Sequence, residues 1–466
     1  MLPLRALVIS YAFPPVGGAG VQRVLKLVKY LPFHGVTPTV LTVENPSVPV
    51  QDASLERDVP KGVEILRART LEPSYAAKQL AWHAAADDSR SVGALLKKRL
   101  VDLARGLVIP DPQALWLPGS AYALVRRLRS AAADDVVFIS GPPFSQFLLA
   151  ALVRLRPRTA VVLDYRDEWT LMRDGYEMGG RSRANAWLER AILRRAHAVT
   201  TATEEFRDEL LLRFGFLDPS RVTAIPNGYD PDDFPERLPT PPVDRFVLTY
   251  VGTVFRLTSA RGLIEGIRRL HARYPELARL LEVRFIGRVV ETEATYFRDT
   301  ESLGISRRDY LEHSAAVREL AASHAVLCVL DDVPGAERIY PGKIFEIMYL
   351  GRPCLTLAQE GTLARLVRRH GLGEVVHPGD PDAIADALAR MLRDFSDGKS
   401  ATHHHAASVS ADIGRFHRKR QAGEFARVFR TAVALAGKIA EESRFGVEHV
   451  RLVPSEIALG ERQDIG

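Results

Sequence analysis

Short apolar runs alternate with amphipathic helical patterns along most of the chain. In the first half, the predicted strands are 6–10, 38–43, 63–68, 136–140, 160–163 and 198–201. In the second half they are 246–252, 281–287, 325–330, 353–356 and 373–376. Strands that alternate with helices are typical of parallel sheets covered by helices. We therefore predict the α/β fold class, with two Rossmann-like strand–helix domains facing each other across a cleft.

Two segments interrupt this alternation. A helical insert is predicted over 73–133, and the proline-rich stretch 235–242 has the composition of a linker. A long helical pattern follows the last predicted strand. The predicted divisions are an N-terminal domain 1–225, a linker 226–245, a C-terminal domain 246–410, a helix 411–442 that is a candidate to cross back to the first domain, and a weakly patterned tail 443–466.

A glycine loop lies between the first predicted strand and the first predicted helix. Gly17, Gly18 and Gly20 come late in this loop, just before a helix with a regular apolar face. A helix N-terminus presents free amides to an anionic or polyol ligand. A dinucleotide-binding turn would place a glycine directly after the strand and another where Arg23 stands. We therefore favour a sugar or phosphate loop over a dehydrogenase turn or a plain structural turn.

A charged cluster, Asp164-Tyr-Arg-Asp-Glu-Trp169, follows an apolar strand pattern. Charges at the carboxyl end of a strand are costly to desolvate unless they face a cleft. We predict active-site roles for Asp164, Arg166 and Asp167. The alternative is a structural ion pair between Arg166 and a neighbouring carboxylate.

The second half carries candidate ligand-binding groups after its own strands. Arg256 and Arg261 are permanent cations that suit a departing diphosphate, or else lie on a solvated face. Lys343 and Glu346 share one helix face, where Glu346 could accept hydrogen bonds from a vicinal diol or simply pair with Lys343. The amides at Gly361 and Thr362 open a further helix and could hold a phosphate.

The composition narrows the classes of partner. The 466 residues carry a formal net charge of +6, without the interleaving of aromatic and basic residues typical of nucleic-acid binding. No apolar stretch approaches the ~20 residues of a membrane span. We expect no nucleic-acid partner and no metal site, since His403-His-His405 and the pair Asp331-Asp332 are weak ligand sets.

The expected location is the cytoplasm. Cys328 and Cys354 lie in apolar runs as reduced, buried thiols would, and Met1-Leu-Pro-Leu-Arg leads directly into a strand pattern without a secretory signal. Residues 92–103 are amphipathic, with a basic cluster at 97–99. This segment either lies on the inner face of a membrane as a peripheral contact or packs on the first domain. The oligomeric state stays open.

Four motifs occur in a specific order: 14–23, 225–230, 341–346 and 376–380. Together they resemble the family 4 glycosyltransferases, which are retaining enzymes of the GT-B fold, over about residues 4–435. The resemblance implies transfer of a sugar from a nucleotide-activated donor to an acceptor, with no metal and no cofactor. It also implies that Arg256 and Arg261 hold the diphosphate, that Glu346 holds the ribose, and that the backbone at Gly17 and Gly18 approaches the donor.

Two departures from the family pattern keep alternatives open. Arg338 stands where the first of two glutamates eight positions apart is expected, with Glu337 beside it. The segment 140–145 lacks a histidine that many members carry, and the cluster at 164–167 is a candidate substitute. The alternatives are a nucleotide-sugar epimerase of the same fold and a catalytically silent sugar-binding protein.

Overall fold

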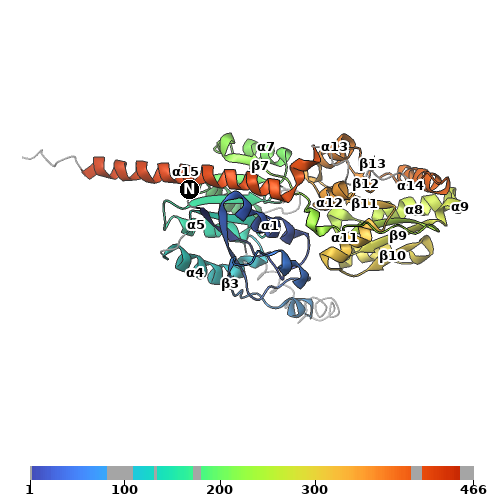
Figure 1. The fold of residues 1–466 in the computed structure, drawn as a ribbon, viewed down its shortest axis with the longest axis horizontal. Helices are drawn as coiled ribbons and strands as arrows, with labels where there is room; N and C mark the ends of the chain where they lie inside the picture. The colour runs from blue at the N-terminus through green and yellow to red at the C-terminus, as the bar shows by residue number, and fades with distance from the viewer. Residues whose placement is uncertain (1–2, 81–108, 131–133, 172–179, 400–411, 452–466) are drawn as a thin grey trace, which may run out of the picture.

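The computed structural model describes residues 3–80, 109–130, 134–171, 180–399 and 412–451 (Figure 1). Each half of the chain forms a parallel sheet with its own hydrophobic core. The first sheet has seven strands in the order β3-β2-β1-β4-β5-β6-β7, and the second has six in the order β10-β9-β8-β11-β12-β13. Every printed pairing within these two sheets is parallel, so the predicted α/β class with two strand–helix domains is confirmed.

The strands of the first sheet are β1 (Leu4–Ile9), β2 (Val36–Val43), β3 (Glu64–Ala68), β4 (Val136–Gly141), β5 (Ala160–Tyr165), β6 (Ala198–Thr201) and β7 (Val222–Ala224). The second sheet has β8 (Phe246–Val251), β9 (Leu281–Ile286), β10 (Ile305–Arg308), β11 (Ala325–Leu330), β12 (Cys354–Ala358) and β13 (Gly373–Val376). The sequence pattern did not predict β7 or β10. Only Ile305 of β10 is buried, and β7 has three residues, so neither edge strand leaves an apolar run to detect.

The helices of the first half are α1 (Ala19–Tyr30), α4 (Leu117–Leu128), α5 (Ala150–Val153), α6 (Gly180–Leu193) and α7 (Glu204–Arg213). Those of the second half are α8 (Arg261–Arg273), α9 (Pro275–Ala278), α10 (Glu291–Ala294), α11 (His313–Ala321), α12 (Lys343–Leu350), α13 (Thr362–Arg369), α14 (Pro381–Ser396) and α15 (Arg418–Arg451). Within the predicted insert 73–133 the structure describes α4. The amphipathic segment 92–103 and the histidines 403–405 lie outside the described residues.

The helix α1 follows the glycine loop as predicted. Its apolar positions Val21, Val24, Leu25 and Val28 are fully buried against the first sheet. Gly18 precedes the helix with φ of 92°, a left-handed value that a residue with a Cβ atom rarely adopts. The loop therefore turns sharply into the first turn of α1.

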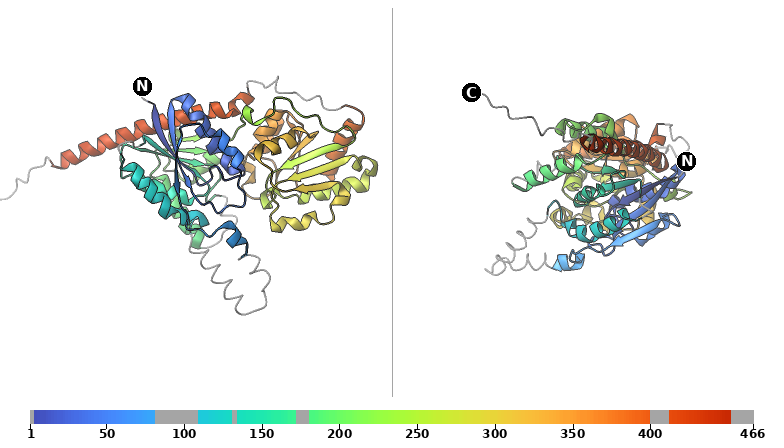
Figure 2. Two further views of the ribbon diagram at one scale, coloured as in Figure 1. Left: turned by 60° about the horizontal axis from the view of Figure 1, so that its bottom comes forward. Right: turned by 90° about the vertical axis from the view of Figure 1, so that its left-hand side faces the viewer.

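The long helix α15 returns from the second domain and lies along the first (Figures 1 and 2). Phe425 and Phe429 pack on Phe138 of β4, with ring centroids 5.5 and 5.4 Å apart. The helix runs to Arg451, into the segment assigned from sequence to a weakly patterned tail. The chain thus passes between the two domains twice, once after β7 and once before α15.

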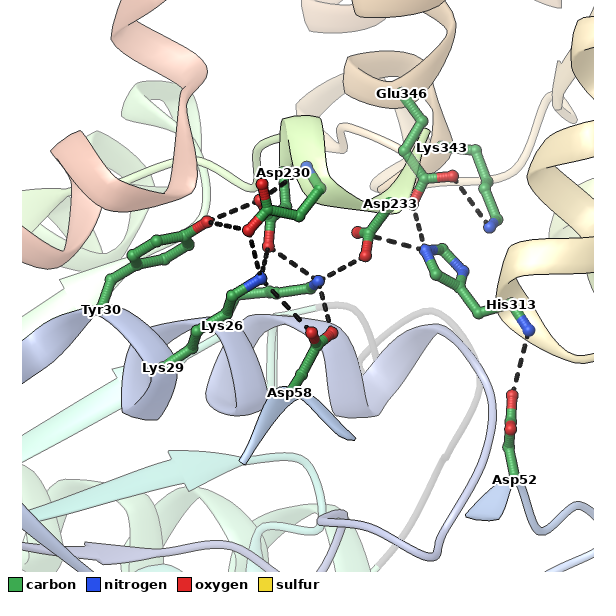
Figure 3. Close-up of polar contacts among 11 residues, drawn as sticks. Lys26, Lys29, Tyr30, Asp52, Asp58, Asp230, Asp233, His313, Lys343 and Glu346 are labelled. Carbon is green, nitrogen blue, oxygen red and sulfur yellow. Dashed lines mark hydrogen bonds and ion pairs between the residues drawn. The ribbon is translucent and has the colours of Figure 1, made fainter. Parts of the chain in front are cut away.

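A buried lysine joins α1 to the segment between the domains (Figure 3). Lys26 has a side chain only 1% exposed, and its Nζ lies 2.7 Å from Asp58 and 2.8 Å from Asp230, with Asp233 also bonded. Lys29 Nζ lies 2.8 Å from Asp230, and the Tyr30 hydroxyl donates to Asp230 at 2.6 Å. Asp230 and Asp233 belong to the turn that follows β7, so this network fixes the first chain crossing to the first domain.

We expect Lys26→Met to destabilise the protein by about 3–5 kcal/mol, because it leaves the buried Asp233 without its lysine and takes one of two cations from Asp58 and Asp230. Urea denaturation followed by circular dichroism measures this change. The matched control is Lys61→Met, which removes an exposed lysine and is expected to change the unfolding free energy by less than about 0.5 kcal/mol. An equal loss of unfolding free energy in Lys26→Met and Lys61→Met would show that the buried lysine network does not stabilise the fold.

The same network predicts how the stability of the protein depends on pH. Burial alone would raise the pKa values of Asp230 and Asp233, but Lys26 and the hydrogen bonds to these carboxylates hold both below the usual range. A carboxyl with a lower pKa in the folded state contributes stability above its unfolded pKa of about 3.9 and loses it as the pH falls further. Unfolding free energy should therefore fall more steeply below about pH 4 in the wild type than in Lys26→Met.

Candidate functional site

Loops that follow the strands of the first sheet contact loops that follow the strands of the second. Glu168, after β5, accepts hydrogen bonds of 2.6 and 2.8 Å from Arg338, after β11. Asp52, after β2, accepts from the Tyr310 hydroxyl at 3.0 Å and from the backbone N–H of His313 at 3.1 Å. The edges at which the strands of the two sheets end therefore face each other. Because ligands of open α/β sheets bind at the carboxyl ends of the strands, the expected site lies between the two domains.

Asp164 is the anchor of a buried ion pair. Its carboxylate is fully buried and is held by Arg23 at 2.8 Å, Ser140 Oγ at 2.7 Å and Thr200 Oγ1 at 2.7 Å. Burial favours a high pKa for this group, but Arg23 and the hydroxyl donors hold the pKa below its usual range. A carboxylate with this many partners and no exposed surface does not reach a substrate. The structure thus gives Asp164 the role of a buried ion-pair partner, and its predicted catalytic role stays a prediction.

Arg166 and Asp167 differ in their surroundings. The Arg166 guanidinium donates to the backbone carbonyls of Gly20, Pro142 and Gly141, so it ties the glycine loop to the loop after β4. The predicted alternative, an ion pair with a neighbouring carboxylate, is not what holds it.

Asp167 is exposed and makes no hydrogen bond or ion pair with the described residues. The surrounding protein still removes enough water to raise the pKa of this carboxyl, while Arg166 opposes the shift. Of the three residues predicted as catalytic, Asp167 offers the available carboxylate.

The glycine loop meets the second domain. A Cβ atom at Gly17 would lie 2.7 Å from Val50 Cγ1 and 3.2 Å from Tyr310 Oη. Glycine is required there because the loop passes between the first domain and Tyr310. The approach of Gly17 and Gly18 to a donor stays a prediction.

Glu346 lies on α12, buried to 8% exposure, with Lys343 Nζ 3.0 Å from its carboxylate. His313 Nε2 lies 3.8 Å from Glu346 and 3.4 Å from Asp233 (Figure 3). Sequence reasoning missed His313, because a single histidine at a helix start gives no signal of which carboxylates face it. The histidine places Glu346 next to the lysine network of the first domain.

The other predicted groups of the second domain share the same edge. The strands β8, β11 and β12 are parallel neighbours, so the residues that follow them gather at one end of the sheet. Arg256 and Arg261 follow β8 with exposed side chains, and Gly361 and Thr362 follow β12. A Cβ atom at Gly361 would lie 2.6 Å from the carbonyl oxygen of Glu337, so α13 begins directly against the segment after β11.

Arg338 is a bridge between the domains. Besides Glu168, its side chain pairs with Glu337, and its carbonyl accepts from Thr203 Oγ1 at 2.8 Å. Arg365 of α13 adds a second bridge to Glu205 of α7. The position where a glutamate was expected from the family pattern thus carries an interdomain contact.

Within the described residues, no group of three or more histidine, cysteine, aspartate or glutamate side chains is arranged to hold a metal ion. The same part of the chain contains no helix that is long and apolar enough to cross a membrane. Cys328 and Cys354 are buried free thiols, and burial raises the pKa of each.

Comparison with known families accounts for both halves of the chain. A glycosyl transferase 4-like domain matches residues 17–228, and a domain described as glycosyl transferases group 1 matches residues 245–394. The chain belongs to the glycosyltransferases. The family resemblance seen in the motifs is confirmed. The first match contains β2 to β7 of the first sheet, and the second contains all six strands of the second sheet.

A curated relative is an alpha-maltose-1-phosphate synthase from Mycolicibacterium smegmatis, 28% identical over 114 residues. The matched segment covers 22% of this glycosyltransferase and 29% of the relative. The chain therefore matches less than a third of the length of this relative, and the match says nothing about which reaction this chain catalyses.

Solved structures show the same GT-B fold. Sucrose-phosphate synthase from Thermosynechococcus elongatus has a TM-score of 0.56 at 15% identity, covering 96% of this chain and 100% of that one. Anabaena HepE, solved in complex with UDP and glucose, has a TM-score of 0.55 at 16% identity, covering 95% and 99%. A protein from Listeria monocytogenes described as a candidate UDP-N-acetylglucosamine 2-epimerase has a TM-score of 0.51 at 12% identity, covering 91% and 95%. At these identities the likeness establishes the fold alone.

We expect the Arg338–Glu168 bridge to behave as a coupled pair. Arg338→Glu places a second carboxylate against the buried Glu168 and should cost about 3 kcal/mol of stability. Glu168→Arg places two guanidinium groups against each other and should cost a similar amount. The double exchange restores opposite charges and should recover at least half of the summed loss. Thermal unfolding of the four proteins measures the coupling. A double variant that simply sums the two losses would show that the bridge contributes no coupling.

Proposed function

We propose that this glycosyltransferase transfers a sugar from a nucleotide-activated donor to an acceptor, with retention of the anomeric configuration and without a divalent metal. The observation that carries the proposal is the buried Glu346, which lies on the same sheet edge as two exposed arginines and a helix N-terminus. Family membership and the fold shared with a UDP- and glucose-bound protein support it.

Glu346 is suited to the ribose of the donor. A carboxylate accepts two hydrogen bonds from a vicinal diol, and burial makes an unmet acceptor expensive. Lys343 and His313 orient the Glu346 carboxylate from two sides. The donor's nucleoside therefore lies over α12, with its diphosphate directed toward the ends of β8 and β12.

The diphosphate carries the charge that develops as the sugar departs. Arg256 and Arg261 supply permanent positive charge near it, and the amides at Gly361 and Thr362 supply donors at the start of α13. These groups could do the work that a divalent cation does in other transferases. Gly17 and Gly18 let the opposing loop approach the sugar without side chains in the way.

Asp167 is the group on the first domain that we assign to the acceptor. Its exposed carboxylate has no protein partner among the described residues, and its raised pKa suits a hydrogen-bond acceptor for a reacting hydroxyl. The acceptor is a glycan, a lipid-linked sugar or a small molecule. The two buried free cysteines agree with a cytoplasmic location for the enzyme.

The test is turnover of a nucleotide-sugar panel by the purified chain with a panel of acceptors. We expect release of nucleoside diphosphate that requires an acceptor, is unchanged by EDTA, and gives a product with the donor's anomeric configuration by NMR. Product formed from donor alone would favour the epimerase alternative. Tight donor binding without turnover would favour a silent sugar-binding protein.

Glu346→Gln should weaken binding of the nucleoside diphosphate about 10- to 100-fold, because a charge-assisted hydrogen bond is worth about 1.5–3 kcal/mol. Isothermal titration calorimetry measures the affinity. Glu276→Gln, at an exposed position on α9, is the matched control. A ligand that lacks the 2′- and 3′-hydroxyls should bind both Glu346 forms equally. If Glu346→Gln weakens binding of that ligand as much as it weakens binding of the full nucleotide, then Glu346 does not bind the ribose hydroxyls.

A further inference from the structure

The first turn of α15 has an unusual charge pattern. Arg418, Lys419 and Arg420 begin the helix, and no acidic residue lies in that turn. Cations at a helix N-terminus are disfavoured by the helix dipole. Lys419 and Arg420 are exposed, where water screens this cost, but Arg418 is only 7% exposed.

Among the described residues, Arg418 has no ion-pair partner. Its backbone N–H donates to the carbonyl of Tyr229 at 2.9 Å, but its guanidinium makes no hydrogen bond or ion pair within the described part of the chain. Buried arginines are normally paired with a carboxylate, because an unpaired buried charge is strongly destabilising. The guanidinium nitrogens are not enclosed either, since none is among the fully buried polar atoms without partners. The small exposed fraction of the residue therefore includes its charged end.

The charges around Arg418 belong to both domains and to the segment between them. Arg23 repels the guanidinium, while Glu346, Asp233 and Asp230 attract it from beyond ion-pair distance. Burial lowers the pKa of Arg418 to about 10, so the group is still charged at neutral pH.

Each of the three attracting carboxylates already has a closer cation. Glu346 has Lys343 at 3.0 Å, Asp230 has Lys26 at 2.8 Å, and Asp233 is bonded to Lys26. Arg23 is likewise matched by Asp164. Lys26 serves two of these carboxylates, so Arg418 balances the charge of the cluster, but among the described residues it is the cation that makes no direct ion pair.

The backbone around Arg418 is held rigidly. Gln421 donates to the carbonyl of Asn227 at 3.0 Å, and a Cβ atom at Gly228 would lie 2.0 Å from the carbonyl oxygen of Phe416. The start of α15 is thus packed tightly against the first chain crossing. The backbone of Arg418 is therefore fixed at this crossing.

We propose that Arg418 binds phosphoryl oxygens of a ligand in the cleft between the domains. A planar guanidinium with no side-chain partner among the described residues matches two oxygens of a phosphate at once. Its nearness to Glu346 makes the donor's diphosphate the source, a part of the inference that rests on the proposed function. The residue comes from the C-terminal helix, outside both matched domains.

The experiment compares Arg418→Met with the wild type, using Arg420→Met as the matched control on the same helix turn. Inorganic pyrophosphate, UDP, GDP, ADP, the corresponding nucleosides and glucose 6-phosphate are titrated by calorimetry. We expect Arg418→Met to weaken binding of pyrophosphate and of the preferred nucleoside diphosphate at least tenfold, and to leave nucleoside binding unchanged. Arg420→Met should match the wild type, and Arg418→Lys should lie between.

Stability separates ligand binding from a structural role. Because no ion pair is lost, ligand-free Arg418→Met should melt at or above the wild-type temperature, while the shift of melting temperature on adding pyrophosphate should be smaller than in the wild type. A ligand-free melting temperature several degrees below the wild type would overturn the proposal. So would unchanged affinity for every phosphate, or a wild type that binds none of them.

The outcome is distinguishable from failure of the proposed function. Pyrophosphate binding that depends on Arg418, in a chain that turns over no nucleotide sugar, would support the phosphoryl site and refute the transferase assignment. If Arg418→Met loses binding of glucose 6-phosphate but keeps binding of pyrophosphate and the nucleoside diphosphates, the phosphoryl site is supported and its ligand is the phosphate of an acceptor.

Discussion

A buried lysine surrounded by carboxylates holds the two domains in register. Lys26 lies on the helix that the glycine loop opens, and two of its partners, Asp230 and Asp233, lie in the chain crossing between the sheets. Removing a charge from such a cluster is costly, so the crossing cannot shift without disrupting α1. The cluster therefore fixes the start of the second domain against α1, close to His313 and Glu346.

Most charged residues at the facing edges are committed to protein contacts. Glu168 and Arg338 form one bridge, Glu205 and Arg365 another, and Arg23 and Asp164 a buried pair inside the first domain. This leaves a small set of groups available to a ligand, of which Asp167 and Arg418 are the clearest. The domain contact at Arg338 also means that, if the enzyme reads its sugar as other family members do, it must use a different side chain there.

From the sequence, the order of strands and helices could be predicted more completely than the contacts between side chains. Apolar runs and the apolar face of α1 are local patterns, so both sheets and the helix after the glycine loop could be foreseen. The edge strand β10 could not, because only Ile305 of its residues is buried. The partner of Asp164 is 141 residues away in the sequence, and the neighbours of His313 and Arg418 come from several segments. Residue types at strand ends suggested a charged site, but only the folded chain decides which charges neutralise one another.

The two chain crossings lie side by side. Tyr229 and His417 pair as neighbouring backbone segments, so the second domain is attached to the first by two adjacent connections rather than one. Rigid bodies joined in this way can rotate about the line through both attachments but resist twisting about other axes. A swing of the second domain about this line would move Arg418 little, because its backbone N–H is bonded to the crossing at Tyr229. A phosphate held at Arg418 would keep its position while the remainder of the cleft opens and closes around it.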